Sequence, residues 1–104
     1  MAITANLELD NGVILTDCYI IIPTVYVRKF TDVDGSNPVF KLIYDAIIYK
    51  DATKRVGGLI QNRIRYTKVD HHKIDYNPTT TDNPFVLAYT HLKTNNNLSN
   101  VADA

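Results

Sequence analysis

The chain has 104 residues, 45% of them hydrophobic and 21% charged, a composition typical of a single folded domain and not of a disordered segment. Eleven basic residues balance eleven acidic ones, so no net charge draws nucleic acid or anionic lipid to the protein. We therefore expect neither nucleic acid nor a membrane as a partner.

The N-terminal segment and the single cysteine bear on the compartment. Cys18 has no second cysteine to pair with and lies in the apolar run DCYIII, where a buried, inert thiol is expected. The opening MAITANLELD lacks the basic start and long apolar stretch of a secretory signal. No apolar run approaches the roughly 20 residues needed to cross a bilayer. We expect a protein made in the cytoplasm.

The first thirty residues predict a β-hairpin, formed by a strand, a tight turn and a second strand. Apolar residues of the first run fall on alternate positions: Ile3, Ala5, Leu7 and Leu9. The pair Asn11-Gly12 follows, and because both residue types accept a positive φ, it favours a tight type I′ turn. Pro23 has no N–H to donate to a strand ladder, so it marks a strand end, a bulge or an edge.

Residues 31–38, TDVDGSNP, predict a solvated loop. Its alternating Asp, Ser and Asn side chains invite comparison with a calcium loop. An EF-hand, however, closes with a glutamate and has a helix on each side. Here Ile43 occupies the closing position and both flanks read as strands, so no calcium site is expected.

The clearest strand is VFKLIYDAIIY. One face carries the alternating residues Phe40, Leu42, Tyr44, Ala46 and Ile48. The opposite face is mixed and carries Lys41, Ile43, Asp45, Ile47 and Tyr49. Such a face suits a covering helix or another subunit.

The stretch LIQNRIRYTKVDHHKIDY predicts a further strand, with Ile60, Asn62, Ile64 and Tyr66 on one face. Its adjacent histidines, His71 and His72, raise the question of a metal site or an acid/base pair. Neighbouring side chains of a strand point to opposite faces, so these two cannot chelate one ion. No spacing in the chain supplies three or four zinc ligands, and no serine or cysteine nucleophile motif occurs. We expect no metal, no cofactor and no catalytic residue.

Near the C-terminus the spacing of apolar residues changes from the period of two that is typical of strands to the period of 3.6 that is typical of helices. Asp82 or Asn83 can cap a helix and Pro84 suits its first position. The apolar stripe of this helix consists of Phe85, Ala88, Tyr89 and Leu92. We predict an α+β fold: an antiparallel meander of about five strands with one C-terminal helix packed on it. The domain covers 1–94, and 95–104 form a flexible tail.

The opening MAITANLELDNGVILTDCYI, the central strand that ends in YKD and the helix NPFVLAYTHLKT together resemble a family of small tailed-bacteriophage proteins. A similar opening, strand ending and helix recur in that family. The helix motif is here Pro84, Ala88, Tyr89, Leu92, Lys93 and Thr94. The chain departs from the family after the helix, where Asn95, Asn96, Asn97 and Leu98 replace a Leu-Pro-Glu-Phe-like stretch. The resemblance implies a small virion protein that works by assembly.

We therefore predict a non-enzymatic virion structural protein, made in the host cytoplasm, that acts through protein–protein contacts in the tail, baseplate or connector region. The expected partners are copies of itself and other virion proteins, with no small-molecule substrate. The residues expected to contact partners are Phe30, Tyr49, Tyr66, Leu98 and Val101. Two alternatives are a capsid-decorating head protein and a cytosolic binding module or host-takeover adaptor. A third is a metal-dependent enzyme that uses His71 or His72.

Overall fold

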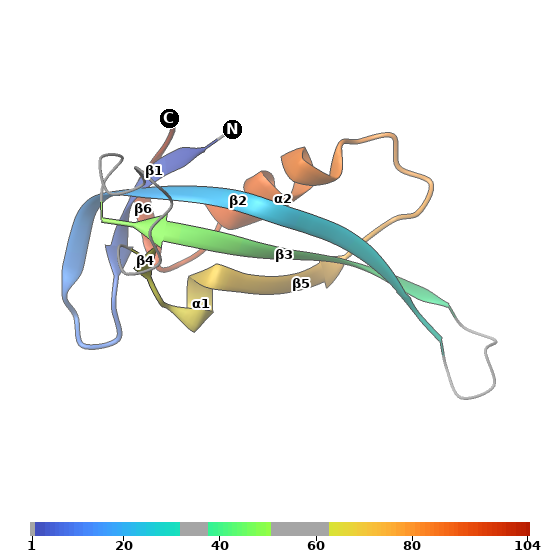
Figure 1. The fold of residues 1–104 in the computed structure, drawn as a ribbon, viewed down its shortest axis with the longest axis horizontal. Helices are drawn as coiled ribbons and strands as arrows, with labels where there is room; N and C mark the ends of the chain where they lie inside the picture. The colour runs from blue at the N-terminus through green and yellow to red at the C-terminus, as the bar shows by residue number, and fades with distance from the viewer. Residues whose placement is uncertain (1, 32–37, 51–62) are drawn as a thin grey trace.

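A computed structural model describes residues 2–31, 38–50 and 63–104. Within them the chain forms a six-stranded sheet and two helices (Figure 1). The elements are β1 (Ile3–Glu8), β2 (Ile14–Phe30), β3 (Val39–Tyr49), β4 (Arg63–Ile64), α1 (Thr67–Asp70), β5 (His71–Asp75), α2 (Pro84–Lys93) and β6 (Leu98–Asp103). The predicted α+β class with an antiparallel sheet is confirmed, although the sheet has six strands where about five were expected.

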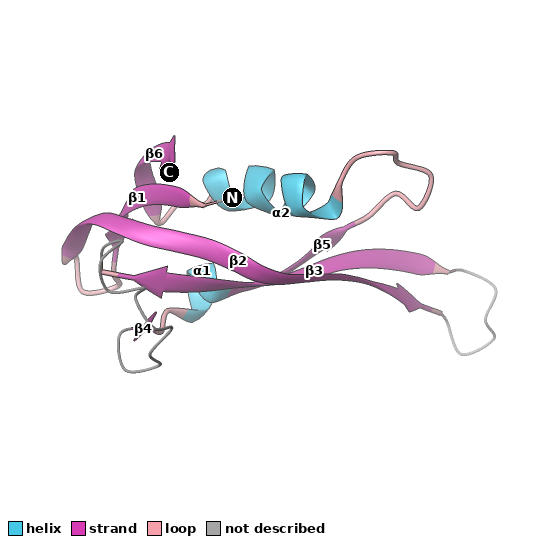
Figure 2. Cartoon of the chain, turned by 45° about the horizontal axis from the view of Figure 1, so that its top comes forward, coloured by secondary structure: helices cyan, strands magenta, loops and turns pink. Residues whose placement is uncertain are grey.

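All pairings in the sheet are antiparallel, in the order β4-β3-β2-β1-β6. β5 pairs with β3 on the same edge as β4 but further along it. The chain thus runs as a meander from β1 to β3 and builds the outer edge of β3 from two short strands. It then crosses the sheet through α2 to reach the opposite edge at β6 (Figure 2).

The predicted hairpin between β1 and β2 is present, but its turn differs from the expected type I′. Of the predicted turn pair Asn11-Gly12, only Gly12 has a positive φ, at +84°. Its N–H donates to the carbonyl of Leu9, and the Leu9 N–H donates to the carbonyl of Val13. The loop between Leu9 and Val13 therefore has three residues. Its last residue is a glycine in the left-handed conformation, which is common in three-residue hairpin loops.

Pro23 lies in a bulge of β2, one of the three outcomes expected for it. Ile21 pairs with Ile47 and Thr24 pairs with Asp45, so two residues of β2 stand opposite one of β3. A bulge shifts the alternation of side chains by one position. β2 therefore continues for seven residues beyond Pro23 with its faces reset, which allows one long strand to serve two regions of the molecule.

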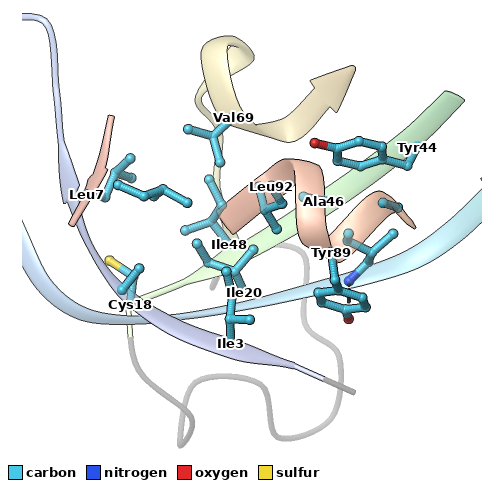
Figure 3. Close-up of a cluster of buried hydrophobic side chains, with 14 of the residues drawn as sticks. Ile3, Leu7, Cys18, Ile20, Tyr44, Ala46, Ile48, Val69, Tyr89 and Leu92 are labelled. Carbon is cyan, nitrogen blue, oxygen red and sulfur yellow. Dashed lines mark hydrogen bonds between the residues drawn. The ribbon is translucent and has the colours of Figure 1, made fainter. Parts of the chain in front are cut away.

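The core lies between the sheet and α2 (Figure 3). The strands β1, β2 and β3 each contribute alternate residues to the core. Examples are Ile3, Ile20 and Ile48, which are all fully buried. α2 adds the buried Ala88, Tyr89 and Leu92, as its apolar period predicts. Phe85 is the exception to the predicted stripe: it is 40% exposed, since it lies in the first turn of the helix.

Asn83 caps α2 as predicted, because its side chain accepts a hydrogen bond of 2.8 Å from the Phe85 N–H. α2 has only ten residues, and no helix in the described part of the chain is long and apolar enough to cross a membrane.

The expectation of a flexible tail at 95–104 is corrected by the structure. Residues 98–103 form β6, which pairs with β1 along the free edge of the sheet. The Asn97 side chain donates to the carbonyl of Glu8, and the Glu8 N–H donates to the carbonyl of Asn97. Leu98 is buried in the core. This short polar segment is therefore ordered, because the edge of β1 pairs with it and the core buries its Leu98.

Candidate interaction surface

The two faces of the sheet differ in what covers them. Residues paired directly across antiparallel strands point to the same side. On one side, the core face, Leu42, Tyr44 and Ile48 meet the helices: the buried residues of both α1 and α2 belong to this core cluster. The other side, which we call the outer face, receives no buried residue from any described helix.

The register of the strands orders the outer face into rows. From one end to the other, these rows are Tyr19 with Tyr49 and Arg63; Ile21 with Ile47; Thr24 with Asp45 and His71; Tyr26 with Ile43 and Lys73; Arg28 with Lys41 and Asp75; and Phe30 with Val39. Apolar or aromatic side chains occur in four of these six rows. Ile43 and Tyr49 are already buried within the chain, whereas Tyr26 and Val39 are 43% and 45% exposed and offer apolar surface that another protein can cover.

Part of the outer face projects as an arm, which we define as residues 24–30 of β2 and 39–45 of β3. The distal end of this hairpin extends past α2 and β5 (Figure 1), while Lys41–Asp45 pair with β5. Tyr26 and Val39 of the outer face are 43% and 45% exposed, and Val27, which pairs with Leu42 on the core face, is 39% exposed. In the described residues, β1 pairs with β2 only as far as Ile20. The edge of β2 along the arm is therefore unpaired, and it can accept a further strand.

Charged side chains surround the aromatic ring of Phe30 on the arm. The guanidinium carbon of Arg28 lies 5.5 Å from the centre of that ring, and the Lys73 Nζ lies 4.8 Å from it. Lys41 forms an ion pair with Asp75. Cations placed over a ring hold it in position and remain free to meet an acidic partner.

A hollow of about 460 Å³ opens where β4 and β5 leave part of the β3 edge unpaired. His71 lines it and forms a 2.6 Å contact through Nδ1 with the Asp45 carboxylate. Arg63 also lines it, and among residues 2–31, 38–50 and 63–104 its buried Nε has no hydrogen-bond partner. The polar groups of His71, Asp45 and Arg63 interrupt the middle of the outer face. The two strands of the arm, in contrast, pair without a break in register.

The five residues predicted to contact partners lie in different environments. Phe30 lies on the outer face of the arm and is half-buried. Tyr49 and Leu98 are only 2% and 8% exposed. Both side chains are buried within the chain, so neither is available to a partner. Tyr66 and Val101 are half-buried and pack against the core. The structure does not bring these five residues together into one surface.

Sequence reasoning missed a partly buried cluster on the core face, formed by the buried Tyr44 and the half-buried His72 and His91. The Tyr44 hydroxyl lies 2.7 Å from Nδ1 of His91, and the rings of His72 and His91 have centroids 5.2 Å apart. Burial raises the pKa of Tyr44, and burial together with the nearby His91 lowers the pKa of His72. The two histidines that are adjacent in sequence point apart, as predicted: His72 faces this cluster and His71 faces outward.

The cluster offers two imidazoles to an ion. No group of three or more histidine, cysteine or acidic side chains suited to a metal occurs among residues 2–31, 38–50 and 63–104. Structural and catalytic zinc sites use at least three protein ligands. The cluster therefore fits a role in linking β3, β5 and α2.

Comparisons with known protein families, with curated proteins and with solved structures found no match for this chain.

Proposed function

We propose that this chain is a non-enzymatic structural protein of a tailed-bacteriophage particle, which acts through protein–protein contacts made by its arm. The observation that supports this proposal best is the arm itself. It combines exposed apolar side chains with an unpaired strand edge in the described part of β2, and its base is anchored in the core by Leu42 and Tyr44.

The exposed side chains of the arm favour assembly. The base of the arm joins the core through Leu42 and Tyr44, but Tyr26, Val27 and Val39 remain 43%, 39% and 45% exposed. Covering these side chains with a partner removes apolar surface from water at about 25 cal/mol per Å². Several weak contacts of this kind become strong when symmetry repeats them in a particle.

The resemblance to small tailed-phage proteins supports the virion, and within it the tail, baseplate or connector region, as the place of assembly. A capsid-decorating role uses the same surface and differs in copy number. A cytosolic binding module or host-takeover adaptor also uses the same surface, but it does not enter the particle.

Quantitative mass spectrometry of gradient-purified particles separates these roles. A few copies per particle, or a multiple that fits a ring, supports the tail or connector, and hundreds of copies support a head protein. A chain abundant in infected cells but absent from particles overturns the virion proposal and favours the adaptor.

The same particles test the arm. Tyr26→Glu places a charge on the exposed outer face of the arm, and we expect particles to lose the chain as a result. Val86→Glu on α2 is the matched control, since Val86 is 45% exposed and lies on the helix. Equal incorporation of both variants contradicts a role for the arm.

A further inference from the structure

The two ends of the molecule are complementary in charge and both expose apolar side chains. One end is the turn between β1 and β2, residues 8–17, which we call the tip. The other is the arm. Figure 1 places the tip and the arm at opposite ends of the longest dimension, which measures 47 Å.

The tip is acidic. The first 27 residues contain Glu8, Asp10 and Asp17 and not a single lysine or arginine. Asp10 contacts the Lys68 Nζ at 2.5 Å, while neither Glu8 nor Asp17 forms an ion pair within the described residues. The tip therefore carries two carboxylates, those of Glu8 and Asp17, that no basic side chain of the described residues pairs with.

The tip is also apolar at its centre. Val13 and Ile14 are 47% and 56% exposed, and Ile14 has the highest exposed fraction of any large hydrophobic side chain described. Ile14 pairs with Glu8 across the hairpin. An exposed isoleucine beside an acidic side chain is suited to a basic, aromatic surface on a partner.

The strands of the arm and its base present such a surface. They carry the basic residues Arg28, Lys29, Lys41 and Lys73 against the acidic Asp45 and Asp75. Lys41 is paired with Asp75 and Asp45 with His71, which leaves Arg28, Lys29 and Lys73 without an ion pair within the described part of the chain. Asp32 and Asp34 of the connecting segment lie outside the described residues.

We infer that the arm binds the tip of a second copy of this chain, in a head-to-tail contact between Tyr26, Arg28 and Lys73 of one copy and Glu8 and Ile14 of the next. A single chain cannot close this contact on itself, since the two surfaces lie at opposite ends of a rigid sheet. A contact between different surfaces leaves one arm and one tip free in every dimer. It therefore builds rings or filaments.

This inference rests on the proposed assembly function and names the partner as a second copy. An arm that pairs with the arm of another copy would instead bring Arg28 and Lys73 of both chains together. Like charges brought together at an interface oppose association. The acidic tip is the complementary surface that the chain itself provides.

Two variants test the contact. The tip variant carries Glu8→Arg and Ile14→Arg, and the arm variant carries Tyr26→Glu and Arg28→Glu. Analytical ultracentrifugation of the purified full chain, over a series that reaches about 1 mM, measures association. We expect the wild type to form species larger than dimers, and each variant alone to associate about tenfold more weakly or worse. Val86→Glu should associate like the wild type.

The decisive sample is an equimolar mixture of the two variants. Each variant keeps one intact surface, so the mixture should form a one-to-one dimer that does not grow. A tip variant that still dimerises alone overturns the head-to-tail contact in favour of arm pairing. A wild type that stays monomeric to about 1 mM also overturns it, yet leaves the proposed function standing if particles contain the chain. Circular dichroism of each variant verifies that it is folded.

Discussion

The hydroxyl of Tyr89 accepts a hydrogen bond of 2.8 Å from the N–H of Ile22, two residues beyond the last pair between β1 and β2. At this point β2 loses its neighbour, and the helix supplies the missing acceptor. The contact joins α2 to the strand where the core ends and the arm begins.

Tyr89→Phe removes that acceptor and leaves the Ile22 N–H buried. We expect a loss of about 1–3 kcal/mol in the free energy of unfolding, because an unsatisfied buried donor keeps its desolvation cost. Urea denaturation measures it. Tyr26→Phe is the matched control, since Tyr26 is 43% exposed and its hydroxyl can bond to water. Equal stability of the two variants would show that the hydrogen bond contributes nothing.

Stability should fall as the pH is lowered through the range in which His72 titrates. Burial and the neighbouring His91 lower the pKa of His72 from its ordinary value of 6.5. The unfolded chain therefore binds more protons than the folded one, so the stabilisation is complete above pH 6.5 and is lost as the pH falls toward the pKa of the folded state.

Urea denaturation at a series of pH values between 8 and 5 measures this slope. His72→Gln should flatten it, whereas Asn96→Gln should preserve it, because Asn96 is exposed and carries no titrating group. The same slope in both variants would exclude His72 as its source.

Leu98→Ala should destabilise the protein by about 2–3 kcal/mol, since Leu98 is buried in the core and its truncation leaves a cavity. Ser99→Ala, at the exposed neighbouring position of β6, should change stability by less than about 0.5 kcal/mol. Thermal or urea unfolding compares them. If Leu98→Ala is as stable as Ser99→Ala, residues 98–103 do not dock as a strand.

Gly12→Ala should cost about 1 kcal/mol, because a side chain at φ +84° is strained even though nothing lies within 4 Å of a Cβ there. Gly12→Asn should cost less, since asparagine tolerates the left-handed region. The two variants are compared by urea denaturation. The reverse order would mean that the turn adopts a different conformation.

Local signals made the hairpin and the helix predictable. Asn11-Gly12 marks the first turn, and Asn83-Pro84 marks the start of α2, because in both places the residues that decide the conformation are adjacent in sequence. Pro23 marked an interruption of β2 for the same reason, although a bulge was only one of three expected outcomes, beside a strand end and an edge.

Features that depend on distant residues were not predictable. β6 has few apolar residues, and it is ordered by the edge of β1 at the other end of the chain. The contact of Tyr44 with His91 and of His72 with both rings requires β3, β5 and α2 to be packed first. The candidate surface depends equally on register, because only pairing of β2 with β3 places Tyr26 beside Ile43.

The most direct test of the central claim places a photo-crosslinking amino acid at Tyr26 and, as a control, at the exposed Thr90 of α2, followed by irradiation of particles that contain the chain. If the arm is the contact surface, position 26 should crosslink to another virion protein chain, including a second copy of this one, and position 90 should not. Particles in which position 90 crosslinks and position 26 does not would contradict the arm as the contact surface.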